Sequence, residues 1–368
     1  SNAWRNKDYE RHRLKVMKAT CAIDVNPPKG RPHVSLNAKG LQLEREKQDR
    51  IFRENFILLK KLCDIMHRKR PTQEILTLSE AAECLHTLGK CDSGLGYAYL
   101  GLNASNKSLT DIGIILCFKY VLYVDVSGNR LTADALRVLA KMTYLLMIQA
   151  DRNKVLSAEM VSMPYLQVLT LNKNKLKSTS GISHKLLECL ELNHNNIEEV
   201  TLNPYDLENL KVLELRGNIL TTTNGIFFPG LIRLYLAENQ IEKLEGLEIL
   251  INLKILHLRS NKLSNMEGFD SRCAKLDYLN LRNNEIAKIS ELEKLSCLPS
   301  LETLVILENP AITDREGDEE STYRQIILAM LPNLTRIDKD SVLYEEKRDA
   351  REFRRQMILD GTKFTDFD

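Results

Sequence analysis

The stretch LIRLYLAENQIEKLEGLEILINLKILHLRSNKL, residues 231–263, contains one short pattern twice. In each copy, leucines spaced LxxLxL are followed by an asparagine, first Asn239 and then Asn261. A polar amide is costly to bury among leucines unless it is hydrogen-bonded. The recurrence therefore predicts that both asparagines have a structural partner.

The pattern LxxLxLxxN matches the chain at nine places, spaced 21 to 25 residues apart. Its asparagines are Asn129, Asn153, Asn174, Asn195, Asn218, Asn239, Asn261, Asn284 and Asn309. Repeats of this length and motif are the signature of leucine-rich repeats. One coil cannot bury its own apolar face, so neighbouring coils stack. We therefore expect an α/β repeat fold, a horseshoe-shaped leucine-rich-repeat solenoid of about nine to ten 21–25-residue coils with helical caps at both ends.

The asparagines have a structural role in this interpretation. The LxL segment predicts a short strand whose leucines point inward. The chain then turns, and the buried backbone groups of the turn need partners. An asparagine amide supplies two donors and an acceptor, so stacked asparagines form a ladder between coils rather than a ligand site. The spacing IxxLxxLxxLxxL from 241 to 253 predicts a short helical or 3₁₀ turn on the convex side.

The repeats are expected to cover residues 99–310. The segments on either side of them are expected to cap or extend the array. Residues 1–3 have the form of a tag remnant, and 4–70 form a basic arm plus a helix. Residues 71–98 are interpreted as a linker and an N-terminal cap helix over 77–90, which begins with a capping box of Thr77 and Glu80. The predicted C-terminal cap covers 311–339 and contains a helix with one apolar face, formed by Tyr323, Ile326, Ile327 and Met330.

The segment 340–368 is predicted to be a charged helical tail. Four of its apolar residues recur at near-heptad spacing, Leu343, Ala350, Phe353 and Met357. Two interpretations stay open at this point. The helix is either solvated on all sides, or it presents this stripe to a partner.

The outward residues of the strands and the residues just after them line the concave face. Acidic residues gather in the first half of this face. Arginine and aromatic residues gather in the second half, and they are Arg216, Arg233, Tyr235, His257, Arg259, Tyr278 and Arg282. Arginine and tyrosine dominate the energetics of many protein interfaces. We predict a partner-binding surface here. The alternative is that any exposed sheet is polar and that the clustering is accidental.

The front of the chain has a different charge from the rest. Residues 1–70 contain 18 Lys and Arg against 8 Asp and Glu, a net charge of +10, whereas the remainder has 34 against 42, a net charge of −8. Candidate contact residues in this basic arm are Arg11, Arg13, Lys15 and Lys18. A basic segment implies an acidic partner, which is nucleic acid, an anionic membrane or an acidic protein surface such as the tails of tubulin, or else it is a merely solvated arm. Few aromatic residues accompany the charge, which argues against nucleic acid.

A helical seam follows within 41–65, with apolar residues at its ends and polar residues such as Asn55 between them. This seam predicts a short coiled-coil-like helix that packs on another surface.

Motifs of catalysis and metal binding are missing from the sequence. There is no GxxxxGK[ST], HExxH or GxSxG, and none of the seven histidines has metal-ligand spacing. We therefore expect no enzyme activity, cofactor, metal or small-molecule substrate. The longest apolar stretch, 112–118, is too short to cross a membrane. Eight cysteines without a CxxC pair indicate free thiols in a reducing compartment, the cytoplasm.

Two resemblances extend this interpretation. The segments YERHRLKVMKA, AIDVNPP and HVSLNAKGLQLEREKQDRIFRENFILL, within 4–70, resemble the Hemingway-type family of cilia- and flagella-associated proteins. The segments YVDVSGNRLT, LYLAENQIEKLEGLE, LHLRSNKL and STYRQIILAMLPNLTRIDK resemble a leucine-rich-repeat family of axonemal radial spokes, over about 90–360. This resemblance implies a non-catalytic structural protein of the axoneme, the cytoskeleton of the motile cilium or flagellum, that contacts other spoke proteins. One departure is that an acidic tail is expected ahead of these repeats, where a basic segment stands here.

Other functions are compatible with the same repeats. The coils and the cap also resemble a nuclear leucine-rich-repeat protein that acts as the regulatory subunit of a protein phosphatase. A third alternative is a spliceosomal repeat protein that holds an RNA-binding domain. Stoichiometric co-purification of a phosphatase catalytic subunit would favour the regulatory subunit. Nuclear location would favour the spliceosomal protein.

Overall fold

The described part of the molecule is a computed structural model covering residues 75–90, 96–313 and 321–368. All of these residues belong to one compact unit, Cys63–Asp368. The predicted basic arm with Arg11, Arg13, Lys15 and Lys18, and the helical seam after it, lie outside the described residues. The account below concerns the repeat array and its two ends.

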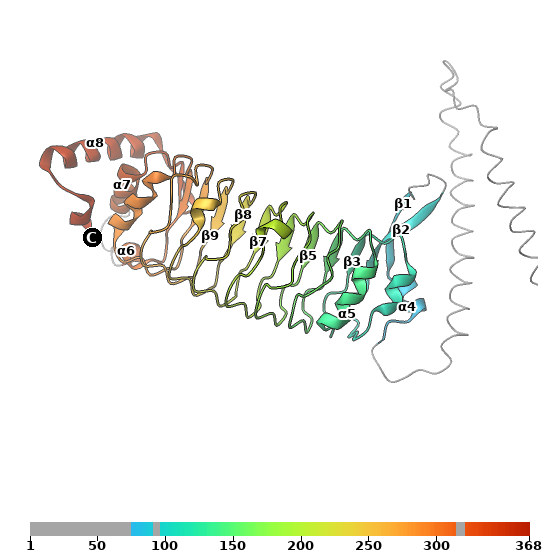
Figure 1. Ribbon diagram of the computed structural model, residues 1–368. Helices are drawn as coiled ribbons and strands as arrows, with labels where there is room; N and C mark the ends of the chain where they lie inside the picture. The colour runs from blue at the N-terminus through green and yellow to red at the C-terminus, as the bar shows by residue number, and fades with distance from the viewer. Residues whose placement is uncertain (1–74, 91–95, 314–320) are drawn as a thin grey trace, which may run out of the picture. The chain divides into compact units, whose positions relative to one another are not determined.

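One sheet runs through the array, and its strands follow each other in chain order (Figure 1). Pairing is parallel from β2 to β12 and antiparallel only between the two strands at each end. The thirteen strands are β1 Leu85–Lys90, β2 Tyr97–Asn103, β3 Tyr123–Asp125, β4 Met147–Gln149, β5 Val168–Thr170, β6 Cys189–Glu191, β7 Val212–Glu214, β8 Arg233–Tyr235, β9 Ile255–His257, β10 Tyr278–Asn280, β11 Thr303–Val305, β12 Arg336–Ile337 and β13 Asp340–Ser341. This arrangement is the predicted leucine-rich-repeat solenoid.

The core is a stack of leucines along the inside of the sheet. The central residue of each short strand is paired in register with its counterpart in the next coil, as Leu213 is with Leu234 and Leu234 with Leu256. All three are fully buried. Full burial of one such side chain contributes about 1.5–3 kcal/mol relative to exposure. Because each coil covers the leucines of its neighbours, the array is stable only as a stack.

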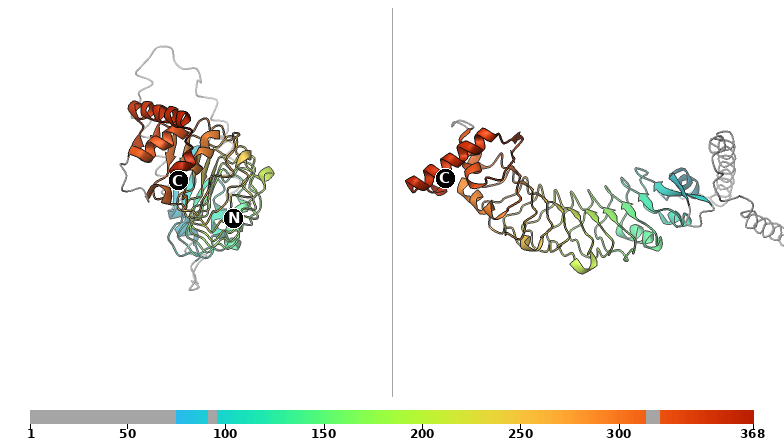
Figure 2. Two further views of the ribbon diagram at one scale, coloured as in Figure 1. Left: turned by 90° about the vertical axis from the view of Figure 1, so that its left-hand side faces the viewer. Right: turned by 90° about the horizontal axis from the view of Figure 1, so that it is seen from above.

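Short helical segments form the side opposite the strands (Figure 2). They are η2 Gly113–Cys117, α5 Ala133–Arg137, η3 Val138–Lys141, η4 Pro204–Asp206, η5 Leu247–Ile249 and η6 Ile289–Cys297. The 3₁₀ turn η5 lies inside the stretch 241–253, where the leucine spacing predicts such a turn.

The N-terminal end differs from the expected cap helix. The capping box is present, since Thr77 accepts a hydrogen bond from the N–H of Glu80 and the Glu80 carboxylate accepts one from the N–H of Thr77. The helix that it starts, α4 Leu78–Glu83, has only six residues. The predicted helix over 77–90 is therefore wrong beyond Glu83, because β1 pairs with β2 instead. Pairing satisfies the backbone groups of β2 that a helix would leave open.

The C-terminal end is a small helical layer. It contains α6 Pro310–Thr313, α7 Ser321–Met330, α8 Tyr344–Asp360 and η7 Phe364–Phe367. Helix α7 lies in the segment expected to cap the array, and its Ile326, Ile327 and Met330 are buried.

Helix α8 packs against α7, so the two interpretations of the charged tail are both wrong for its apolar stripe. Ala350 and Met357 are buried within this chain, and the ring of Phe353 lies 5.5 Å from that of Phe367. Leu343 does not join the stripe, since it precedes the helix and is exposed.

Among the helices of the described residues, none combines the length and the apolar character needed to span a membrane.

Candidate partner-binding surface

The nine motif asparagines lie buried between adjacent coils and join them. Asn239 is representative. Its amide nitrogen donates to the carbonyl oxygens of Leu215, at 2.9 Å, and Leu236, at 3.0 Å. Its amide oxygen accepts from the N–H of Leu220 at 3.1 Å. The side chains of all nine are thus occupied by backbone groups, and none is available to a ligand on the strand face.

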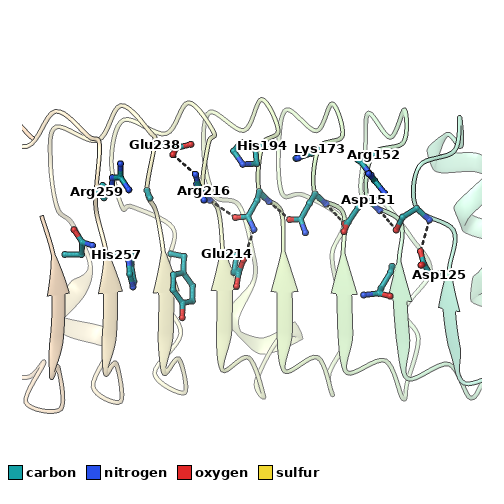
Figure 3. A pocket seen from close by; sticks show the side chains of 17 residues that line it. Asp125, Asp151, Arg152, Lys173, His194, Glu214, Arg216, Glu238, His257 and Arg259 are labelled. Carbon is teal, nitrogen blue, oxygen red and sulfur yellow. Dashed lines mark hydrogen bonds and ion pairs between the residues drawn. The ribbon is translucent and has the colours of Figure 1, made fainter. Parts of the chain in front are cut away.

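The strand face is hollowed into a groove of about 870 Å³ (Figure 3). Its lining changes in charge along the array. Acidic residues such as Asp125, Asp151 and Glu214 line one part, and Arg216, His257 and Arg259 line the other. The strands position these side chains because alternate residues of a strand point to opposite faces.

Amides of neighbouring coils hold the carboxylates of the acidic part. Asn172 donates to Glu191 at 2.8 Å, and Asn193 donates to Glu214 at 2.6 Å. Burial raises the pKa of Glu191, and it raises the pKa of the nearby Cys189 thiol to about 11. A thiol with such a pKa is a poor nucleophile at neutral pH. Within the described ranges, no group of three His, Cys, Asp or Glu side chains is arranged to hold a metal ion.

The seven predicted contact residues lie on β8, β9 and β10, in the turns that follow β9 and β10, and, for Arg216, in the turn after β7. Arg233 and Tyr235 are on β8, His257 is on β9 and Tyr278 is on β10. The ring of His257 stands between the two tyrosine rings, with centroids 4.9 Å from each. Burial lowers the pKa of His257, which favours its neutral form. The three rings form a continuous aromatic stack across three coils.

The arginines differ in how they are engaged. Arg216 pairs with Glu238 at 2.7 Å, and Arg282 pairs with Glu308. The bond to Arg216 lowers the pKa of Glu238. Arg259 makes no ion pair or side-chain hydrogen bond with any residue of the described part. Arg233 makes none either, but it does not line the groove, so Arg259 is the unpaired arginine of the predicted surface that lies in the groove.

The sequence reading missed the residues that directly precede the ladder asparagines. Glu238 and Glu308 are two of them, and the same position contributes Arg152, Lys173 and His194 to the groove. These residues have positive φ angles of 52° to 60°, since the chain turns sharply at this point. A signal was available, because the position lies one residue before each motif asparagine and is charged in several coils.

A second series of hydrogen bonds crosses the strand face at the position two residues before each ladder asparagine. We call it the face series. In its first coils, the side chain of one coil accepts from the N–H of the next, as Asp151 Oδ1 accepts from Asn172 at 2.8 Å and Asn172 Oδ1 accepts from Asn193 at 2.8 Å. Asn193 Oδ1 accepts in the same way from Arg216 at 2.9 Å, where the run of bonds ends (Figure 3).

Comparison of the sequence with family models agrees with the repeat architecture. A family model described as Leucine-rich repeat matches residues 230–359, and one described as Hemingway/CFA97 matches residues 11–88. The internalin inlF of Listeria monocytogenes, a solved structure, aligns with a TM-score of 0.45 and 16% identity over 70% of this chain and 88% of that one.

Relatives of higher identity cover most of the array. Leucine-rich repeat-containing protein 23 of Bos taurus is 42% identical over 280 residues, which are 76% of this chain and 80% of that protein. The Homo sapiens protein of the same name is 42% identical over 77% of this chain and 80% of its own length. U2 small nuclear ribonucleoprotein A' of Homo sapiens is 30% identical over 39% of this chain and 52% of that protein. By its identity and coverage, the chain belongs to the family of leucine-rich repeat-containing protein 23.

Proposed function

We propose that the chain is a non-catalytic structural protein of the motile cilium axoneme, which docks other radial spoke proteins on its strand face. The family membership and the Hemingway/CFA97 match support a cilium-associated leucine-rich-repeat protein. The basic arm, with Arg11, Arg13, Lys15 and Lys18, contacts an acidic surface, such as tubulin or a spoke protein, in this proposal. No nucleic acid, membrane or small-molecule substrate is required.

One observation carries the docking surface. Arg259 stands without an ion pair among the described residues, next to the aromatic stack of Tyr235, His257 and Tyr278. Aromatic residues and arginine supply most of the binding energy in many interfaces, because they bury large areas and make several directed contacts. Solenoids of this kind present their curved inner surface for such contacts.

The test is recovery of spoke proteins from axonemal extract on the immobilised full chain. Arg259→Glu should remove this recovery, since it reverses the charge at the centre of the surface. Its melting temperature should stay within a few degrees, because Arg259 makes no internal ion pair. Lys243→Glu is the matched control, since Lys243 is exposed in the loop after the ladder asparagine of the adjacent coil and does not line the groove.

Undiminished recovery with Arg259→Glu would contradict docking on this surface. Recovery of a phosphatase catalytic subunit in stoichiometric yield, in place of spoke proteins, would contradict the axonemal role and support a regulatory subunit.

A further inference from the structure

The face series has a gap in the coils of β8 and β9. Nine residues occupy its position, and the N–H groups of seven donate to a side-chain acceptor. The N–H groups of Ala237 and Arg259 have no acceptor among the described residues. These two donors lie in adjacent coils and line the groove.

The gap arises because the two positions that supply the acceptor in other coils hold residues that do not accept a hydrogen bond here. In six of the seven bonded positions the acceptor is either the face-series residue of the preceding coil or the residue two places earlier in the same coil, as Asn280 is for Arg282 at 3.1 Å. The seventh, Leu307, donates to Asp338, which follows the last coil. For Ala237 these positions hold Arg216 and Tyr235. For Arg259 they hold Ala237 and His257. Arginine and alanine have no side-chain acceptor, and the two aromatic rings are stacked together instead.

The surroundings of the two donors favour an anion. The guanidinium of Arg259 stands in the same groove without an internal ion pair, and the carboxylate of Glu238 beside it is already paired with Arg216. Hydrogen bonds from N–H groups to an ionised oxygen are roughly twice as strong as those between neutral groups. The chain itself shows which anion suits this position, since Asp338 Oδ1 accepts from the N–H groups of Ile306 and Leu307 at 2.8 and 3.0 Å. Asp151 accepts at the same position in the acidic part.

We propose that the gap binds the carboxylate of an aspartate or glutamate side chain from a partner protein. The carboxylate accepts from the N–H groups of Ala237 and Arg259, and it pairs with the Arg259 guanidinium. In this way the partner completes the face series, and the neighbouring stack of Tyr235, His257 and Tyr278 contacts the apolar part of the bound segment. The inference rests on the proposed docking function and names the chemistry that the surface recognises.

The first experiment observes the two amides directly. The full chain is labelled with ¹⁵N and titrated with a short peptide of alternating glutamate and serine, or with its glutamine counterpart. The glutamate peptide should shift the amide resonances of Ala237 and Arg259 more than those of Asn172 and Asn193, whose N–H groups are already bonded. The glutamine peptide should leave all four unchanged.

The second experiment closes the gap from within. Ala237→Asn places an acceptor where Asn172 and Asn193 have theirs, so that it bonds the N–H of Arg259. This variant should bind the glutamate peptide roughly tenfold more weakly, which corresponds to the loss of one hydrogen bond to a charged group. Ser127→Asn introduces the same residue at the same position outside the gap and should leave the affinity unchanged.

Three results would overturn the proposal: no shift of the Ala237 amide, equal binding of both peptides, or unchanged affinity in Ala237→Asn. Its failure is distinguishable from failure of the docking function. The distinguishing result is Arg259-dependent recovery of spoke proteins while the acidic peptide leaves the Ala237 amide resonance unshifted. That result would retain the docking surface and exclude the carboxylate site.

Discussion

Asn239 donates a hydrogen bond of 2.9 Å to the carbonyl oxygen of Leu215, a residue of the preceding coil. The same amide bonds the N–H of Leu220 in that coil and the carbonyl oxygen of Leu236 in its own. One side chain thus satisfies three backbone groups that are closed off from water. Since the coils repeat this arrangement, one asparagine in each repeat supplies hydrogen bonds to the backbone groups that the turn would otherwise leave buried and unpaired.

Asn239→Leu should lower the free energy of unfolding by about 1–3 kcal/mol, because it leaves buried donors and acceptors unpaired. Urea denaturation followed by circular dichroism measures this change. Gln240→Leu is the control, since Gln240 is the adjacent residue and is exposed, and its effect should stay within about 0.5 kcal/mol. Equal stabilities of the two variants would contradict the structural role of the ladder.

A buried histidine should make stability depend on pH. His184 is fully buried, its Nδ1 accepts from the N–H of Met163 at 3.0 Å, and burial lowers its pKa from 6.5 to about 4. Below pH 6.5 the imidazole of His184 is protonated in the unfolded chain but stays neutral in the folded chain. Stability is therefore complete above pH 6.5 and falls as the pH drops towards 4. Between pH 7 and pH 5, the titration of this histidine should lower the free energy of unfolding by about 2 kcal/mol.

Urea unfolding at pH 7 and pH 5 checks this value in the wild type and in His184→Asn. The variant keeps an acceptor for Met163 and removes the titrating ring, so its pH dependence should be smaller by that amount. The carboxylates titrate in both proteins and cancel in the difference. The same pH dependence in both would contradict the lowered pKa, because it would show that His184 takes up its proton equally in the folded and the unfolded chain.

Glycine is required at one turn on the side opposite the strands. Gly268 has a φ of 99°, and a Cβ added there would collide with the carbonyl oxygen of Leu244 in the preceding coil. Gly268→Ala should destabilise the chain by more than about 1 kcal/mol, because both the backbone angle and the contact are unfavourable. Gly230→Ala is the control, since an added Cβ would have its nearest neighbours at 3.6 Å. Thermal unfolding distinguishes the two, and equal melting temperatures would contradict the steric explanation.

The repeat architecture could be predicted because it depends on residues that recur. Leucine and asparagine occupy equivalent places in every coil, so the strands and the ladder positions follow from counting. The strand β1 could not be predicted in this way. Leu85 and Leu88 are three residues apart, which fits a helix as well as a strand, and only pairing with β2 decides between them.

The strand positions of the candidate residues could be predicted from the sequence, and their contacts less well. Tyr235 and His257 are register partners, so their proximity follows from the register. Tyr278 pairs with Ile255 and contacts His257 diagonally, which the register alone does not show. The pairing of Arg216 with Glu238 depends on a turn residue with positive φ, which the strand pattern does not include. The hydrogen bonds of the face series do not follow from the repeat motif, because Ser127, Asp151 and Asn172 share an acceptor oxygen but not a residue type.

The reversal of the outermost strands has a consequence for how the molecule behaves among its own copies. A parallel array of coils is open to growth, because a further coil or another chain can align with its last strand. Here β1 and β13 run against the direction of the strands between them. A second molecule that approaches either end meets a strand of the wrong polarity for continuing the series, and β13 has only two residues. The polarity of the end strands therefore disfavours continuation of the parallel series by another chain.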